Sequence, residues 1–263
     1  MARCRGSFVV MARPRAWQMV FLGAWLIGRA SAAAQAPVDS TLQRTHLDAA
    51  GLRGGQFVYQ FTLERDTGST TLGTRTVGLS ETTYAGAPAW LLVETRSGDG
   101  IAAADSLVAG RADLHPIHCS STQGAARLAA EFAGDSVFGV TSSPLGKRSF
   151  AAAVPAGAIV NAAALETRLR LLALQSGWRD STASLSLSYA TTTILPTQLA
   201  VTGEETVRAP AGVFDCWVVT ATADIARATY WVSKRDPVVV RSVQVLPALG
   251  GARVVSTLTT RVP

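Results

Sequence analysis

The chain has 263 residues, of which 48% are hydrophobic, 16% charged and 7% aromatic, a composition that supports a folded core and excludes an intrinsically disordered protein. The formal net charge is +6, but five of the 24 basic residues and none of the 18 acidic ones lie in residues 1–34. The remainder is close to neutral and lacks the basic surface that phosphate backbones require, so we expect no nucleic-acid partner.

Residues 1–34 have the pattern of a cleaved secretory signal peptide. Arginines as far as Arg15 precede an apolar run over 19–28, and a stretch of small residues follows. As a helix this run would span about 15 Å, roughly half of a bilayer core, although an uncleaved N-terminal anchor is an alternative. We expect a periplasmic or secreted protein, cut after Ala34, that is not an integral membrane protein after cleavage. Met11 is an alternative start.

The rest, residues 35–263, reads as one mainly β domain of short strands separated by Gly, Pro, Asp and Ser. Such spacing with little helix predicts a curved antiparallel sheet that forms a barrel, a half-barrel or a sandwich. The expected strands are 57–63, 72–79, 89–95, 101–108, 185–189, 198–202, 205–209, 214–221, 228–233, 238–245 and 253–259.

One amphipathic helix is expected near residues 162–174. Asn161 is a suitable N-cap, and Leu165, Leu169 and Leu172 recur at helical spacing. This pattern predicts a helix that lies on or across the sheet.

Three side chains of the kind that bind metals occur in one short stretch: His115, His118 and Cys119. A zinc site needs three or four ligands, and Pro116 favours an extended chain that points the two histidines to opposite faces. We therefore expect an ordinary strand, with no metal and no other cofactor. The same histidines are the most realistic bases for a hydrolase, but no nucleophile motif accompanies them, so we expect no catalytic residues.

Cys119 and Cys216 are the two cysteines that follow the leader. An oxidising compartment permits a disulfide between them. The alternative is two separate buried thiols that behave as small apolar side chains. The sequence leaves both interpretations open.

Aromatic side chains mostly fall in the expected strands. In a small barrel they would fill the interior, which is the commoner role of such residues, whereas in a wider half-barrel they would line an apolar cavity able to hold a lipid chain. The candidate cavity-lining residues are Phe57, Tyr59, Phe61, Trp90, Phe214, Trp217 and Trp231.

A motif near the C-terminus carries a family resemblance. It comprises residues 201–207, 209–219, 230–234 and 237–241, with a turn that contains Pro210 and Gly212 at its centre. This motif resembles the DUF3108 family of exported bacterial proteins, and residues 113–116 and 150–177 also look similar.

The motif itself makes sense as scaffold, since Pro210 and Gly212 suit a tight turn between two strands and nothing in it needs a catalytic role. The family that it resembles has no settled activity. Its layout of sheet and helix is similar to that of LolA-type periplasmic lipoprotein carriers, which hold acyl chains in an unclosed barrel. Because aromatic-rich alternation comes with no catalytic set of residues, we expect an exported protein that binds a lipid-like apolar ligand or an envelope partner without catalysis. The alternatives are a structural envelope protein with a filled core and, least favoured, a hydrolase.

Overall fold

The computed structural model describes residue 47 and residues 49–98, 100–155, 157–187, 192–224 and 226–262. These residues form fourteen strands and one α-helix, with short 3-10 turns at Ala49–Gly51 and Pro247–Leu249. The elements are β1 (Gly55–Arg65), β2 (Gly68–Tyr84), β3 (Ala87–Gly98), β4 (Ile101–Gly110), β5 (Pro116–Gln123), β6 (Ala126–Ala133), β7 (Ser136–Ser143), β8 (Gly146–Ala153), α1 (Ala162–Leu169), β9 (Arg179–Leu187), β10 (Thr192–Ala209), β11 (Gly212–Ala223), β12 (Ala226–Ser233), β13 (Val239–Leu246) and β14 (Ala252–Val262).

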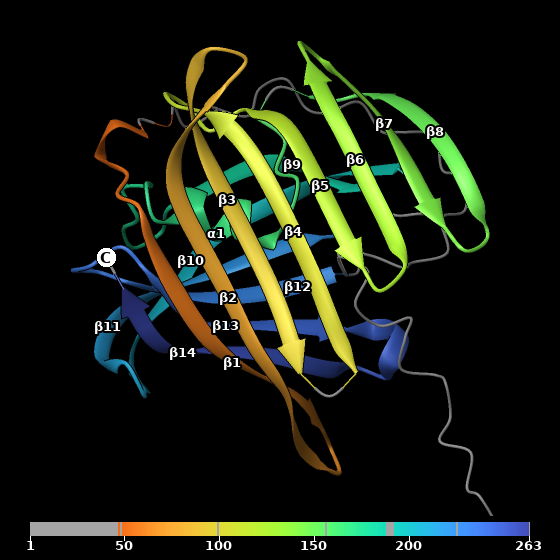
Figure 1. The fold of residues 1–263 in the computed structure, drawn as a ribbon. Coiled ribbons are helices and arrows are strands. Elements are labelled where there is room, and N and C mark those ends of the chain that lie inside the picture. Colours follow the sequence, from red (N-terminus) through yellow and green to blue (C-terminus); the bar gives the residue numbers. More distant parts are fainter. Residues whose placement is uncertain are drawn as a thin grey trace, which may run out of the picture.

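All fourteen strands belong to one antiparallel sheet in the order β8-β7-β6-β5-β4-β3-β2-β1-β14-β13-β12-β11-β10-β9. Neighbours in space are neighbours in the chain, except where β1 pairs with β14 and joins an N-terminal wing of eight strands to a C-terminal wing of six. The sheet bends strongly but does not close (Figure 1). The predicted mainly β class and the half-barrel are therefore confirmed.

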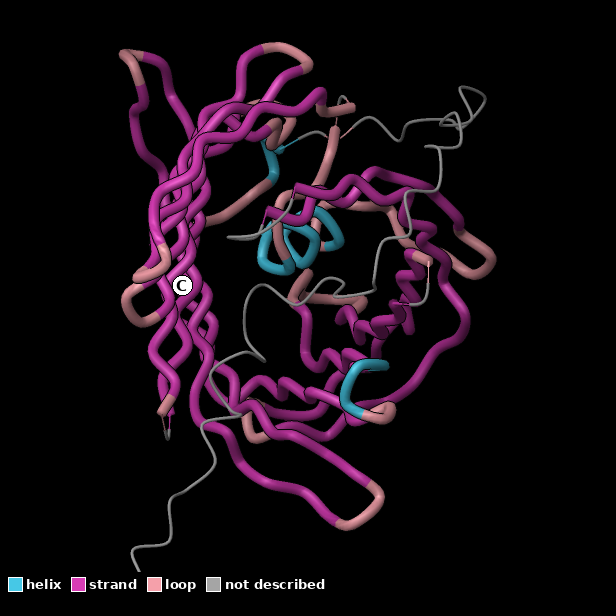
Figure 2. The backbone as a smooth tube through the Cα atoms, turned by 90° about the vertical axis from the view of Figure 1, so that its right-hand side faces the viewer, coloured by secondary structure: helices cyan, strands magenta, loops and turns pink. Residues whose placement is uncertain are grey.

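The two wings curl over a shared concave side. Leu185 of β9, the last strand of the C-terminal wing, belongs to the same apolar cluster as Leu92, Leu107 and Val137 of the N-terminal wing. The helix α1 lies inside this curve (Figure 2). It packs Leu165 and its neighbouring leucines against the inward residues of β10–β13. The interior is thus covered from both wings although the sheet itself stays open.

Helix α1 starts where the sequence predicts and ends earlier. The side chain of Asn161 accepts a 2.8 Å hydrogen bond from the backbone N–H of Ala164, which caps the first turn. The helix ends at Leu169 rather than at 174, and Nε of its C-cap residue Arg170 donates to the carbonyl of Pro237 at 2.9 Å. No helix in the described part of the chain is long and apolar enough to cross a membrane.

The β10–β11 hairpin carries the family motif at its tip. Pro210 and Ala211 form the turn, and Gly212 follows with φ of +136°, a conformation that favours glycine. The N–H of Ala211 donates to the carbonyl of Leu258 on β14 at 3.4 Å. The hairpin therefore bends back over the sheet and helps to cover one end of the interior.

Replacing the cap tests how firmly α1 is held. Asn161→Ala removes the acceptor for the Ala164 N–H and should lower the free energy of unfolding by about 1 kcal/mol. Asn161→Ser, which can still cap, should lose much less. Urea denaturation of the three proteins measures the difference, and equal losses in both variants would contradict a capping role.

Candidate functional site

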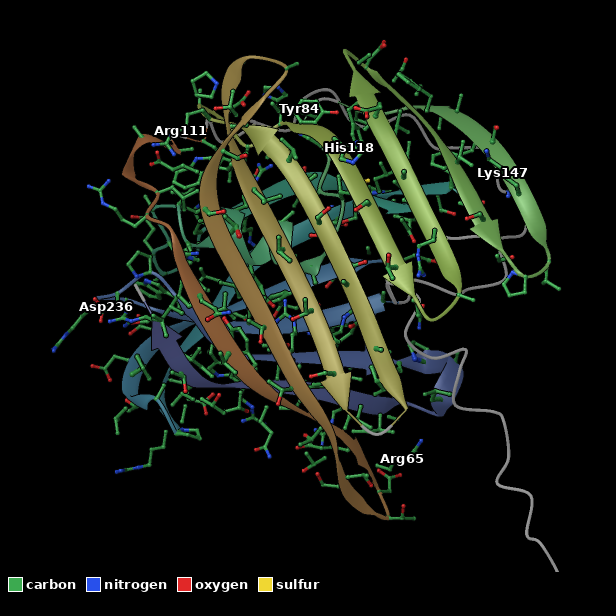
Figure 3. The ribbon with its side chains drawn as sticks, in the orientation of Figure 1. Arg65, Tyr84, Arg111, His118, Lys147 and Asp236 are labelled. Atoms are coloured by element: carbon green, nitrogen blue, oxygen red, sulfur yellow. The ribbon has the colours of Figure 1, made fainter. Side chains whose placement is uncertain are left out.

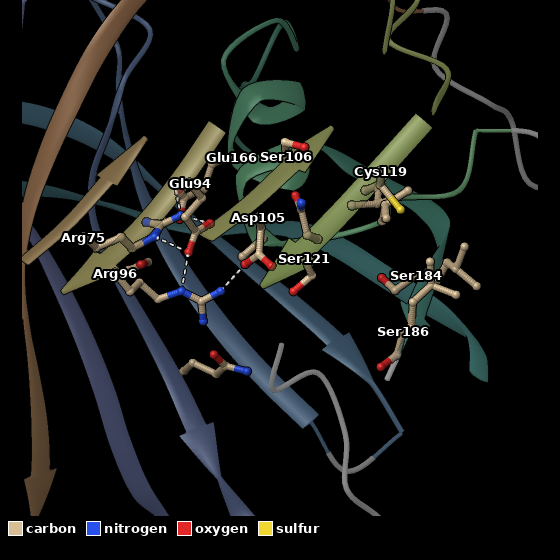
Figure 4. Close-up of a pocket in the computed structure, with 18 of the residues that line it drawn as sticks. Arg75, Glu94, Arg96, Asp105, Ser106, Cys119, Ser121, Glu166, Ser184 and Ser186 are labelled. Atoms are coloured by element: carbon tan, nitrogen blue, oxygen red, sulfur yellow. Dashed lines mark hydrogen bonds and ion pairs between the residues drawn. The ribbon is translucent and has the colours of Figure 1, made fainter. Parts of the chain in front are cut away.

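A cavity of about 150 Å³ lies on the concave side, between the two wings and α1 (Figure 4). It draws residues from strands of both wings, from the segment before α1 and from α1 itself. The lining consists of Phe61, Arg75, Glu94, Arg96, Asp105, Ser106, Cys119, Ser120, Ser121, Leu128, Ile159, Val160, Asn161, Ala162, Glu166, Ser184, Leu185, Ser186, Leu187, Ser242, Gln244, Leu246, Val254 and Ser256.

Four charged side chains, two basic and two acidic, lie close together on β2, β3 and β4. Arg75 stands directly opposite Arg96, and Glu94 directly opposite Asp105. Like charges opposite one another destabilise a sheet, but here the ion pairs connect unlike charges. Glu94 Oε1 lies 3.0 Å from Arg75 Nε and 3.2 Å from Arg96 Nε, and Arg96 also pairs with Asp105. Each guanidinium is therefore held by a neighbouring carboxylate.

Helix α1 adds a fifth charge to this network. Glu166 lies 2.9 Å from Nη1 and 3.0 Å from Nη2 of Arg75, a bidentate pair across the interior. Two residues further along the same helix, Arg168 reaches Asp180 of β9 at 3.4 Å. The helix is thus tied to the N-terminal wing by one ion pair and to the C-terminal wing by another.

The two buried carboxyls that share Arg75 differ in acidity. Burial opposes ionisation of Glu94, but the charges of Arg75 and Arg96 outweigh it and lower its pKa from 4.5 to about 2. Burial raises the pKa of Glu166 above its ordinary value, because Arg75 offsets the loss of water only in part and the charge of Glu94 opposes a second negative charge. The network therefore holds Glu94 ionised and disfavours the charge on Glu166.

Neutral polar side chains continue the cavity wall beyond the charges. Ser121 stands opposite Asp105, and on the other wing Ser242 stands opposite Ser256. Facing residues share a side of the sheet, whereas sequence neighbours alternate. Ser106 and Ser120 therefore point to the outer face, where their hydroxyls lie 2.8 Å apart.

The comparisons with known proteins identify the family. Residues 58–251 match the DUF3108 model, described as a protein of unknown function. The chain belongs to the DUF3108 family. A solved structure, that of a DUF1329 family protein from Desulfovibrio piger, is similar at 10% identity and a TM-score of 0.29, over 81% of this chain and 86% of that one. No curated protein matches the sequence.

In this DUF3108 protein, one of the seven aromatic candidates, Phe61, lines the cavity. Phe57, Tyr59 and Trp90 are buried in apolar clusters, and the Tyr59 hydroxyl donates to the carbonyl of Val239 at 3.1 Å. These three serve the core rather than the cavity wall.

The remaining aromatic candidates lie on the C-terminal wing and are partly buried. Phe214 packs beside the motif turn. The ammonium group of Lys234 lies 4.1 Å from the ring centre of Trp217, and Trp231 Nε1 donates to Glu205 at 2.7 Å. None of the three is part of the cavity lining as the structure describes it.

The two cysteines are free, buried thiols, so the structure does not contain the disulfide considered above. Cys119 of β5 lines the cavity, whereas Cys216 of β11 packs in a cluster with Val207 and Val240. Burial raises the pKa of each thiol to about 12. Both are therefore protonated and weakly nucleophilic at neutral pH.

The histidines of the short stretch bind separate carboxylates. His115 Nδ1 lies 2.6 Å from Asp113, and His118 Nδ1 lies 2.8 Å from Glu131. His118 stacks with Tyr84, whose hydroxyl also contacts Glu131, near one end of the sheet (Figure 3). Within the described residues, no group of three or more His, Cys, Asp or Glu side chains could hold a metal.

Removing the charge of Glu94 tests the network. Because its pKa falls from 4.5 to about 2 on folding, ionised Glu94 stabilises the fold above pH 4.5, by about 3 kcal/mol at pH 7, and this stability is lost as the pH falls through 2. Glu94→Gln should therefore destabilise strongly at pH 7 and by less than half as much at pH 3, in urea denaturation.

The matched control is Glu64→Gln, which breaks a partly exposed pair with Arg253. It should change the free energy of unfolding by less than about 1 kcal/mol at either pH. An equal loss for Glu94→Gln at both pH values would show that the ion pairs contribute nothing beyond the shape of the side chain.

Proposed function

We propose that this protein is an exported, non-catalytic binding protein of the periplasm or cell exterior, which holds a small apolar or amphipathic ligand inside its half-barrel. The observation that carries the proposal is the cavity between the wings, which combines apolar and polar walls in a partly enclosed space. Mixed walls of this kind suit a molecule with one apolar and one polar end.

The apolar part of the cavity wall comes from several strands and from the segment before α1. Phe61, Leu128, Leu185 and Leu246 belong to four different strands, and Ile159 lies just before α1. At roughly 15 Å³ for each water-sized position, the cavity has room for about ten non-hydrogen atoms. A ligand would bury one end in this cavity, and the rest of a longer ligand would extend out through the cavity opening.

The charges in the cavity support binding rather than catalysis. Arg75, Glu94 and Arg96 are paired with one another, which suits structural ions and not a poised acid or base. The thiol of Cys119 is protonated at neutral pH. The described lining includes no histidine that could activate it.

A structural envelope protein is the second candidate. The observation in its favour is the size of the cavity, since about 150 Å³ is below the roughly 300–1,000 Å³ usual for ligand sites. Four apolar clusters occupy much of the remaining interior. The two candidates differ in one measurable respect, which is whether the purified protein binds an apolar molecule.

Binding of N-phenyl-1-naphthylamine, an uncharged fluorescent probe, separates them. The native protein should bind it with saturation, and Ser121→Phe, which fills the cavity, should weaken binding at least tenfold. Leu145→Ser changes a fully exposed side chain on the β7–β8 turn and should bind as the native protein does. Circular dichroism confirms that each variant is folded. Equal binding by Ser121→Phe, or none by the native protein, would favour the structural role.

Export is tested by expression with the natural leader in a Gram-negative host. The chain should appear in the periplasmic fraction or the medium, and N-terminal sequencing should begin at Gln35. A chain started at Met11 should be exported equally well, since it retains the apolar run and the small residues. Retention of an intact leader in the inner membrane would instead support an anchored protein.

A further inference from the structure

We infer that the ligand of this cavity carries an uncharged, hydroxyl-bearing head group, of the size of glycerol or a single sugar. This inference rests on the proposed binding function and adds the chemical class of the ligand. Three features of the cavity carry it: the sum of its charges, the way those charges are paired, and the neutral side chains beside them.

The charged side chains of the lining carry no net positive charge at neutral pH. Its ionisable acids and bases are the guanidiniums of Arg75 and Arg96 and the carboxyls of Glu94, Asp105 and Glu166. With all five ionised the sum is −1, and with Glu166 protonated it is zero. A phosphate or carboxylate head would therefore leave water for a site that offers it no net attraction.

The pairing reduces the attraction for either sign of charge, although Arg96 Nε, which lies 3.2 Å from Glu94 Oε1, makes no hydrogen bond to any residue that the structure describes. The two Nη groups of Arg75 pair with Glu166, and its Nε pairs with Glu94. Arg96 lies between Glu94 and Asp105. Figure 4 shows the chain of contacts along one side of the cavity. An anionic head would have to displace a carboxylate from a guanidinium, and a cationic head a guanidinium from a carboxylate. Breaking such a buried pair is strongly unfavourable.

Neutral groups remain for recognition. Ser121 faces the cavity from the N-terminal wing, and Ser242 and Ser256 face it from the C-terminal wing. A serine hydroxyl both donates and accepts, and so does the hydroxyl of a polyol or sugar. Such a head can satisfy these groups without disturbing the ion pairs, while its apolar end contacts Leu128 and Leu185.

Three ligands with the same eight-carbon chain test the head group at pH 7. Isothermal titration calorimetry with octyl β-glucoside, octanoate and octylammonium, all below their micelle concentrations, should give a dissociation constant at least tenfold lower for the glucoside. Ser121→Ala should weaken the glucoside several-fold and leave octanoate unchanged, because it removes a hydroxyl and no charge.

Asp105→Asn should shift the selectivity towards the anionic ligand. It frees one edge of the Arg96 guanidinium and raises the charge of the lining by one unit. Octanoate should then bind at least tenfold more tightly than to the native protein, with little change for the glucoside. Glu81→Gln makes the same change in total charge at an exposed pair with Arg111, outside the lining, and should alter neither.

The outcomes separate this inference from the proposed function. Tighter native binding of octanoate or octylammonium than of the glucoside overturns the inference and leaves the binding function standing. Binding of N-phenyl-1-naphthylamine without binding of any octyl ligand also overturns it, because no head group is then recognised. If no compound binds, including that probe, the binding function fails and the inference fails with it.

Discussion

The fold depends on a guanidinium that holds two carboxyls inside an open sheet. Arg75 joins Glu94 of its own wing to Glu166 of the helix, and both ends of this contact are almost completely buried. In a sheet of fourteen strands that does not close, the hydrogen bonds between strands do not fix the distance between the two wings. The sheet alone would therefore leave its concave side exposed to solvent. The buried ion pairs fix the helix within that curve. They also explain why part of the interior is polar.

The open sheet leaves two edge strands, and the molecule treats them differently. β9 is covered by the segment before α1, since the N–H of Ile159 donates to Ala183 at 2.7 Å and the carbonyl of Ile159 accepts from Leu185 at 2.8 Å. On β8, Lys147 and Arg148 are exposed, and charged edge residues of this kind oppose pairing with another chain. One edge is thus used to hold the helix in place, and the other is protected by charge.

The sequence predicted the fold class better than the site. Residues 57–63 were predicted as a strand, and lie within β1, because large apolar residues alternate there with period two. Strands β6, β7 and β8 were missed because their alanines, glycines and serines give only a weak alternation. The charge network was missed for a different reason. Acidic residues and arginines in strands ordinarily face solvent. Which of these side chains pair across neighbouring strands depends on the register of the strands. One local signal was present: Glu94 and Arg96 continue the inward series that Trp90 and Leu92 begin.

The aromatic candidates are mostly packed outside the cavity lining. Phe57 and Tyr59 are buried in one apolar cluster and Trp90 in another. The lining itself combines serines with charged and apolar side chains. A polar wall in a partly enclosed space distinguishes ligands by their hydrogen-bonding groups, because an unmatched buried polar group is costly whereas an apolar contact tolerates many shapes. On the proposed binding function, selectivity therefore belongs to the polar wall of the cavity and not to the aromatic residues that the sequence makes prominent.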